Sequence, residues 1–261
     1  MDHHTNWFSW FPGYQHLQAY LNEHYRHTIV FPGGDGARFE TVHHIFAGAA
    51  VVLFLMLLSL YARARVKDVE KALIPPTRFG VVAFFEMILD AVMGMMKGVL
   101  GDQYKRYVPL IGTLALFILF SNLLGLIPGF IPPTDNLNTT LACALVVFVY
   151  FNFHGLRVQG VHHLLHLANP VGAWWGWFLS PLLLPVEIVG LLVRPLSLSL
   201  RLAGNMIGDH KVLFAFAGLV PLLVPLPFYA LGLVVSLIQT AVFCILSTVY
   251  IALHTAEEEH H

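Results

Sequence analysis

The sequence predicts an all-α integral membrane protein with about five transmembrane helices and one amphipathic interfacial helix, the last two spans being long and tilted. Two observations lead to this class. Of the 261 residues, 57% are hydrophobic and only 11% are charged, against roughly 25% charged in an ordinary soluble domain. Mean hydropathy is +0.71. We therefore expect an extracytoplasmic N-terminal segment over 1–42 and a single membrane domain over 43–261.

Each expected span corresponds to an apolar run that approaches or exceeds the ~20 residues needed to cross a hydrocarbon core. The first is expected near 43–62, where Tyr61 and Arg63 stand at its end as interfacial residues. The others are expected near 107–131, 137–153, 174–220 and 222–253. Because the last two exceed one upright span, they must tilt, kink or continue outside the core.

The segment 77–100 is apolar apart from a few charged residues. At about 100° per residue, Glu86, Asp90 and Lys97 fall within roughly 40° of one another on a helix. A narrow polar stripe of this kind is typical of an interfacial helix, or of a helix whose stripe meets a partner protein. A sixth span that hides the stripe inside the bundle is the alternative.

The basic residues predict the orientation. Most of the 14 Lys and Arg residues lie in the segment that joins the first two confident spans, and short loops rich in these residues stay in the cytoplasm. The N-terminus is then expected outside and the C-terminus inside. The net charge of -1 provides no basic field for a nucleic-acid backbone, so no nucleic-acid partner is expected. The apolar spans are expected to contact membrane lipid.

The most informative residues are ionisable groups inside or beside one apolar stretch, where each costs about 2.5–3.5 kcal/mol on insertion scales. They are Glu187, Arg194, Arg201, Asp209 and Lys211. Glu187, Arg194 and Arg201 are spaced by seven residues and therefore share one helical face. An arginine there stays protonated at any working pH, because its pKa lies above about 12. It is suited to attracting a carboxylate that comes to it.

Further polar residues accompany these charges. Ser197, Arg201, Asn205 and Asp209 are spaced by four residues and form a ridge that drifts slowly around the same helix. The last span adds Gln239 and Ser236 among Leu, Val and Ile. A glutamine in a helix interior usually bonds a facing polar group, and next to an arginine-bearing helix we favour a functional role over simple interhelical contact.

Three segments of the sequence resemble a known protein family. RPLSLSLRLAGNM over Arg194–Met206, TDNLNTT over Thr134–Thr140 and SLIQTAVFCILSTVYI over Ser236–Ile251 are similar to the a subunit of the membrane sector of F-type rotary ATP synthases. The resemblance covers most of the chain. It implies an ion-translocating stator with two offset aqueous half-channels, which is not an enzyme by itself and carries no cofactor or metal.

The resemblance also implies partners and a location. A ring of c subunits, each with one mid-membrane carboxylate, would turn against this chain, and a peripheral stalk of b subunits would hold it. The remainder of the F-type ATP synthase would make the ATP. The expected location is the inner membrane of a bacterial cell, with the N-terminus periplasmic and the C-terminus cytoplasmic. Protons are the expected coupling ion, with Na⁺ as the alternative.

Individual roles follow from the same resemblance. Arg201 matches the family's essential arginine, which receives the deprotonated rotor carboxylate and separates the half-channels, and Asp135 matches an acidic position near the outer mouth. The other expected members of the ion pathway are Glu187, Asn205, His210, Gln239, Asp209, Ser197 and Ser236.

The chain departs from the family pattern at two positions. Asp209 stands where the family commonly has glycine, and Gly232 stands where some members carry His or Glu. The Asp209 carboxylate is either a second relay group or a salt-bridge partner of Lys211 or Arg194. From sequence alone both interpretations remain open.

Two other functions would account for some of these residues. The 15 histidines raise the possibility of a haem-binding respiratory subunit, but only His210 lies convincingly within a span. A secondary transporter could use Arg201 to bind an anionic substrate, but transporters commonly show internal repeats. Here the polar groups are concentrated in the last third of the chain.

Overall fold

The computed structural model describes residues 13–24, 43–65, 80–127, 129–159, 176–219 and 225–255. Over these ranges the chain is helical and contains no strand, which confirms the predicted all-α class. Most of the expected N-terminal segment 1–42 and the edges of three expected helices (77–79, 174–175 and 222–224) lie outside the described residues.

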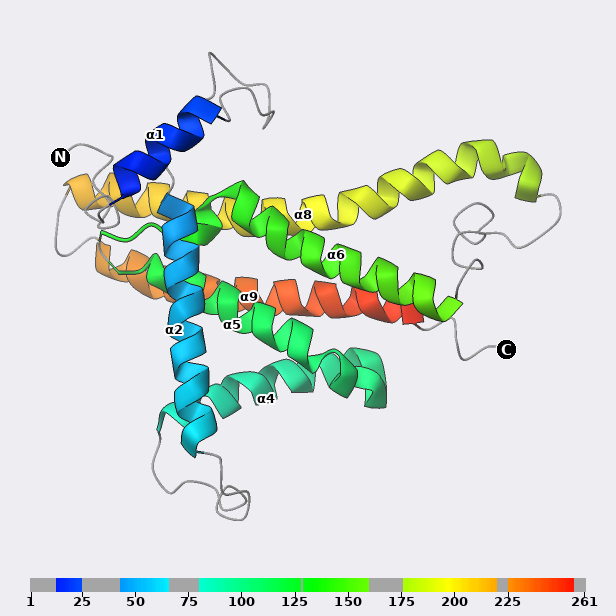
Figure 1. The fold of residues 1–261 in the computed structure, drawn as a ribbon, viewed down its shortest axis with the longest axis horizontal. Coiled ribbons are helices and arrows are strands. Elements are labelled where there is room, and N and C mark those ends of the chain that lie inside the picture. Colours follow the sequence, from blue (N-terminus) through cyan, green and yellow to red (C-terminus); the bar gives the residue numbers. More distant parts are fainter. Residues whose placement is uncertain are drawn as a thin grey trace. The chain divides into compact units, whose positions relative to one another are not determined.

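The elements follow one another along the chain in the order shown by the colours of Figure 1. They are α1 Tyr14–His24, α2 His43–Arg65, α4 Val81–Leu100, the 3-10 helix η2 Gly101–Arg106, α5 Val108–Leu124, the 3-10 turn η3 Pro133–Asp135, α6 Leu137–Gln159, α8 Gly176–Leu219 and α9 Pro225–Thr255.

Within the described ranges, four helices contain segments long and apolar enough to cross a membrane. These segments are His43–Ala64, Leu137–Arg157, Leu183–Leu213 and Leu226–Leu253. The fifth apolar helix, α5, has 17 residues and ends at Leu124, short of the expected 131. The amide of Gly125 turns back to the carbonyl of Asn122 at 3.1 Å. The exact number of spans remains a prediction, whereas the great length of α8 and α9, 44 and 31 residues, is observed.

Two helix ends show how the local sequence sets these bounds. Asn136 precedes α6, and its side-chain Oδ1 accepts a hydrogen bond of 2.9 Å from the amide of Asn138, which is the usual N-cap geometry. α4 ends at Leu100 and is capped by Gly101, which has a φ of 57° and donates its amide to the carbonyl of Lys97. Glycine adopts this left-handed conformation without the penalty that a Cβ would bring.

The chain divides into two compact units. Unit 1 comprises 1–75, 116–139 and 206–236, and unit 2 comprises 76–115, 140–205 and 237–261. The boundaries cut through α5, α6, α8 and α9, so that each of these helices contributes residues to both units.

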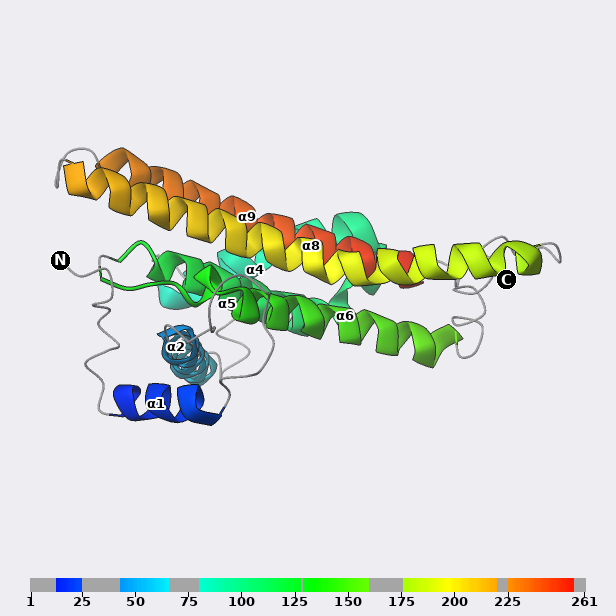
Figure 2. The same ribbon diagram turned by 90° about the horizontal axis from the view of Figure 1, so that it is seen from above.

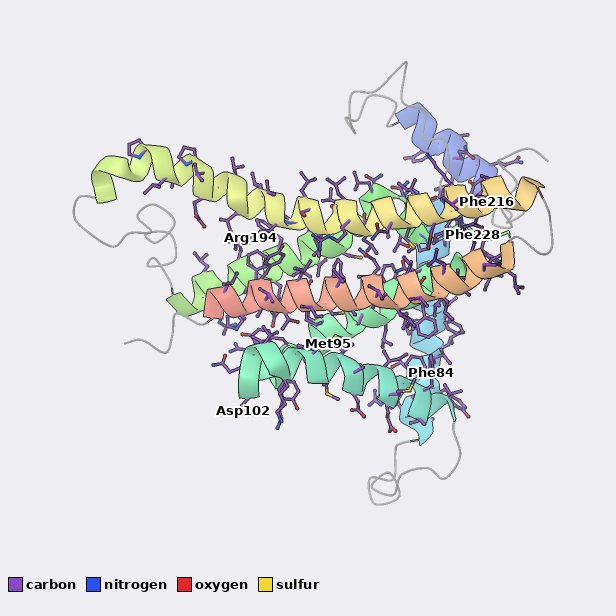
Figure 3. All side chains as sticks on the ribbon, turned by 180° about the vertical axis from the view of Figure 1, so that it is seen from behind. Phe84, Met95, Asp102, Arg194, Phe216 and Phe228 are labelled. Atoms are coloured by element: carbon purple, nitrogen blue, oxygen red, sulfur yellow. The ribbon has the colours of Figure 1, made fainter. Side chains whose placement is uncertain are left out.

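Unit 1 packs α1 and η3 against α2. The rings of Tyr14 and Phe46 lie 5.6 Å apart, and Figures 1 and 2 both show α1 beside the N-terminal part of α2. Pro133 of η3 lies against α2 at Gly48, where an added Cβ would be 3.9 Å from the Pro133 ring. In the same unit the ends of α8 and α9 are joined by the stacked rings of Phe216 and Phe228, 4.6 Å apart, both labelled in Figure 3.

Unit 2 is built around fully buried aromatic residues. Tyr107, Phe151 and Phe243 are each at most 2% exposed. The hydroxyl of Tyr107 is hydrogen-bonded to Nε2 of His154 at 2.9 Å. The α8 portion of this unit contains three internal prolines, at 181, 185 and 195. Each removes a main-chain donor and tends to bend a helix, and Figure 1 shows α8 bending towards its N-terminal end.

Candidate functional site

Arg201 lies on the α8 stretch of unit 2 with its side chain exposed. Within the described part of the chain, no hydrogen bond or ion pair holds its guanidinium. Gly204 and Asn205 are exposed beside it, and the neighbouring Leu200 is 50% exposed. We call these four residues the arginine face: a cation and an amide within an apolar, uncovered surface of a membrane helix.

The second feature of this part of α8 is a bond to the last helix. Asn205 Nδ2 donates a hydrogen bond of 2.7 Å to Oε1 of Gln239, and Gln239 is only 5% exposed. The structure therefore brings these two predicted site residues together. The bond joins α8 to α9 four residues, just over one helical turn, after Arg201.

Arg194 occupies a different environment although it precedes Arg201 by seven residues. Its guanidinium lies over the ring of Tyr250 on α9, 5.8 Å from the ring centroid, and the side chain is half-buried. Figure 3 labels Arg194 on α8. A guanidinium over an aromatic face is stabilised within the protein itself. The predicted pathway residues Glu187 and Ser197 are also half-buried, and neither is hydrogen-bonded or ion-paired within the described residues.

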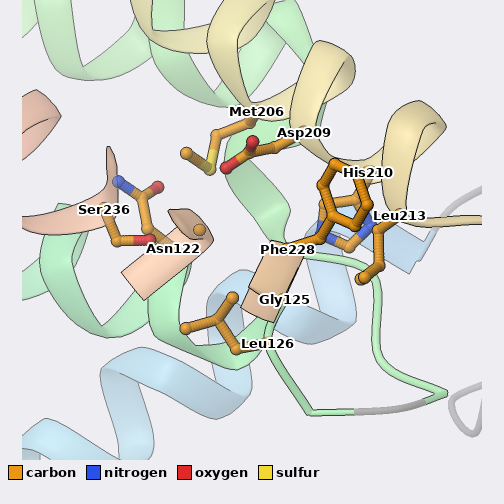
Figure 4. A pocket seen from close by; sticks show the side chains of 10 residues that line it. Asn122, Gly125, Leu126, Met206, Asp209, His210, Leu213, Phe228 and Ser236 are labelled. Atoms are coloured by element: carbon orange, nitrogen blue, oxygen red, sulfur yellow. The ribbon is translucent and has the colours of Figure 1, made fainter. Parts of the chain in front are cut away.

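Unit 1 contains a pocket with a cavity volume of about 20 Å³ that is partly open to its surroundings. Four polar side chains line it, shown in Figure 4: Asn122 from α5, Asp209 and His210 from α8, and Ser236 from α9. The remaining wall includes the apolar side chains Leu126, Met206, Leu213 and Phe228. The structure therefore collects three predicted site residues around one space that can accommodate water.

Two glycines make room for the ionisable groups of this pocket. A Cβ added to Gly125 would lie 2.5 Å from Nε2 of His210, closer than real contacts allow. A Cβ on Gly232 would lie 2.8 Å from Leu126 Cδ2 and 3.4 Å from a carboxylate oxygen of Asp209. The departure from the family at Gly232 therefore coincides with the extra carboxylate at Asp209, because the space that a side chain would take is used by its neighbours.

Asp209 forms no ion pair with any described residue. The relay interpretation is compatible with a position on the pocket wall, and both interpretations stay predictions. Lys211 acts instead on Asp135 of η3. Burial raises the pKa of the Asp135 carboxyl, and the positive charge of Lys211 opposes that shift.

Beside Asp135, a polar contact links η3 to α2. Asn136 Nδ2 donates a hydrogen bond of 3.3 Å to Nδ1 of His44. This contact and the Asp135 carboxyl belong to unit 1, as the pocket does. The predicted acidic position therefore lies in a polar, half-buried environment.

The sequence reasoning missed two residues of this unit. Asn122 is 2% exposed, and Thr134 is completely buried. The Thr134 hydroxyl donates a hydrogen bond of 2.7 Å to Oδ1 of Asn122. One signal was available for Asn122, since an amide inside an apolar run is costly to bury without a partner. Thr134 carries no such signal, because its contact depends on the fold.

Comparison with known proteins places this chain among similar sequences. Residues 44–252 match the family described as ATP synthase A chain. The ATP synthase subunit a of Geobacter sulfurreducens is 46% identical over 241 residues, which cover 90% of this chain and 99% of that protein. The ATP synthase subunit a of Sorangium cellulosum is 41% identical over 233 residues, 89% of each chain. That of Trichlorobacter lovleyi is 44% identical over 242 residues, 90% of this chain and 99% of that protein.

Proposed function

The chain belongs to the ATP synthase A chain family, and from this premise we propose how its residues serve as the proton-translocating stator of a rotary F-type ATP synthase. It is a multi-pass membrane component of that complex and not an enzyme alone. The family match favours neither a secondary transporter nor a haem-binding subunit.

The observation that carries the proposal is the exposure of Arg201 on a membrane helix. A lipid-facing guanidinium costs at least about 2.5–3.5 kcal/mol, so this face requires a partner. A ring of c subunits, each presenting a carboxylate, is the partner of matching charge. Glycine at 204 allows the backbone of a neighbouring helix to approach closely.

Arg201 then acts as the counter-charge of the rotor. A bare carboxylate cannot enter lipid because of its desolvation penalty, so it must carry its proton wherever it faces lipid. Opposite Arg201 it can be ionised. Its positive charge favours release of the proton from each rotor carboxyl group that arrives. Because the arginine does not release its own proton, it also blocks direct proton flow between the two half-channels.

The Asn205–Gln239 hydrogen bond supports this arrangement. It ties α8 to α9 just after Arg201, which limits rotation of the helix that carries the arginine. Arg194, held by Tyr250, is assigned no contact with the rotor. The two arginines of the motif therefore have different tasks.

The unit 1 pocket supplies one aqueous half-channel. Asp209, His210 and Ser236 line it, and Asp135, with Lys211 beside it, stands near its outer mouth. Glu187 and Ser197, half-buried on the preceding part of α8, belong to the half-channel that opens to the other side. Protons entering by one path and leaving by the other turn the rotor, driven by about 2.3 kcal/mol per charge per 100 mV.

The orientation completes the proposal. The N-terminus lies in the periplasm and the C-terminus in the cytoplasm of a bacterial cell, with the protein in the inner membrane. The excess of Lys and Arg between the first two confident spans supports this direction. The b-subunit stalk holds the chain stationary while the ring turns.

The experiment that tests the proposal is ATP-driven proton pumping in inverted membrane vesicles containing the whole complex. We expect Arg201→Ala to abolish pumping while the complex still assembles. Arg194→Ala is the matched control, because the same residue type is removed from the same helix, and it should keep most of the pumping. Near wild-type pumping by Arg201→Ala would show that Arg201 is not the rotor's counter-charge.

A further inference from the structure

Within the pocket of unit 1, the amide of Asn122 is in an unusual state. Its side chain is 2% exposed, and its Oδ1 accepts the hydroxyl of Thr134 at 2.7 Å. Its Nδ2 is buried and donates to no described protein atom. Buried N–H groups are nearly always bonded, to ordered water where the protein offers no acceptor.

We propose that Thr134 is a positioning residue of the proton path: it fixes the Asn122 amide so that the NH₂ group binds a water molecule in the pocket. The inference rests on the proposed function, because it assigns a role within that half-channel. Thr134 itself, on η3, is not among the pocket-lining residues. It acts only through Asn122.

The amide orientation decides the orientation of the water. Oδ1 already accepts the Thr134 hydroxyl, so the NH₂ group is the part of Asn122 without a described protein partner, and it can only donate. A water that accepts from Nδ2 directs its own hydrogens away from Asn122, towards the acceptors on the pocket wall. The Asp209 carboxylate is the charged acceptor there, and a charged acceptor forms the stronger bond. The water is thus held as a donor to Asp209.

The pocket has the properties that this role requires. It contains space for water alongside polar groups from α5, α8 and α9, and a bound water typically needs two to four polar partners. Without the Thr134 hydroxyl the amide could turn and present Oδ1 instead. It would then compete with Asp209 for the hydrogens of the same water.

The test is a double-substitution cycle on the whole complex, read as ATP-driven pumping per assembled complex. Thr134→Val removes the donor at similar size, and we expect a roughly fivefold loss, the order expected for one hydrogen bond. Thr134→Ser keeps the hydroxyl and should restore pumping. Asn122→Leu should lower pumping as well, and adding Thr134→Val to it should cause no further loss, because Thr134 acts only through Asn122.

Controls separate this inference from simple structural damage. Thr248→Val removes another buried hydroxyl, one bonded only to the carbonyl of Cys244 on its own helix, and should pump as wild type. If Thr134→Val fails to assemble, Thr134→Ala provides the same loss of donor. Wild-type pumping by the donor-free variant, failure of Thr134→Ser to rescue, or additive losses in the double variant would each overturn the proposal.

Arg201→Ala is measured in the same series to distinguish failure of the stator proposal from failure of the role proposed for Thr134. If it abolishes pumping while Thr134→Val pumps normally, the stator proposal stands and the role of Thr134 is refuted. If Arg201→Ala pumps normally, the stator proposal itself fails.

Discussion

The polar residues of α8 occupy two contrasting environments. On the arginine face, Arg201 and Asn205 are exposed on a helix whose other described exposed residues are apolar, apart from Lys211. In the pocket, His210 is buried and Asp209 half-buried. A charge exposed on a membrane helix is costly in lipid and therefore favours contact with a partner protein. Buried polar groups around a cavity favour bound water. Under the proposed function, one helix carries both the face that meets the rotor and part of the water path.

After the loss of Arg201, the largest effect should come from filling the pocket. In Gly125→Ala the new Cβ would lie 2.5 Å from His210 Nε2 and 2.8 Å from Cγ of Pro132, and the rigid proline ring cannot give way. We expect pumping to fall by roughly fivefold to a hundredfold, which corresponds to the 1–3 kcal/mol typical of overpacking.

Gly190→Ala is the matched control for this substitution. Gly190 also lies on an apolar helix, and nothing lies within 4 Å of an added Cβ. Alanine is the better helix former by about 1 kcal/mol, so the control should assemble and pump as wild type. Equal pumping by the Gly125 and Gly190 variants would show that the pocket tolerates closure and does not carry protons.

A smaller effect is expected from the bond that supports the arginine face. Asn205→Leu and Gln239→Leu each remove one partner of the 2.7 Å hydrogen bond. Each should lower the pumping rate by roughly threefold to tenfold, since one hydrogen bond contributes about 0.5–1.5 kcal/mol. The double variant should be no worse than the more damaging single one. Strictly multiplied losses would mean that the two side chains act separately.

The smallest effect concerns the acid at the expected outer mouth. Burial raises the pKa of Asp135 and Lys211 opposes the rise, so Lys211→Ala should raise this pKa further. A raised carboxyl pKa means that the folded protein holds the proton more tightly than the unfolded chain. Its contribution to stability therefore falls as pH increases from the unfolded pKa through the folded one.

Infrared titration of the protonated carboxyl, taken as the difference between each protein and its Asp135→Asn counterpart, measures this pKa directly. We expect the midpoint to move to higher pH in Lys211→Ala. An unchanged or lower midpoint would show that Lys211 does not act on Asp135.

The fold class and part of the candidate site could be predicted from the sequence because charged and polar side chains inside apolar runs are costly to bury and therefore easy to recognise. Arg201 and Gln239 were found by that reasoning. The spacing of seven, however, grouped Arg194 with Arg201. Their different surroundings depend on Tyr250, 56 positions beyond Arg194 in the chain, which no helical spacing shows.

The pocket shows the same limit more strongly. Thr134 meets Asn122 because the chain turns after α5 and returns through η3, and the α5 helix ends earlier than its apolar run suggests. The coincidence of Asp209 with Gly232 was visible in the sequence only as two departures from a pattern. Its physical reason is the space beside Leu126 that Gly232 and Asp209 share in the structure.

The most direct test of the central claim is passive proton leak through the membrane sector after removal of its ATP-hydrolysing head, in vesicles with an imposed membrane potential. The account predicts a faster leak for Arg201→Ala than for wild type or Arg194→Ala, because the fixed charge between the half-channels is gone. A leak from Arg201→Ala no faster than that from Arg194→Ala would contradict the assignment of Arg201 as the barrier.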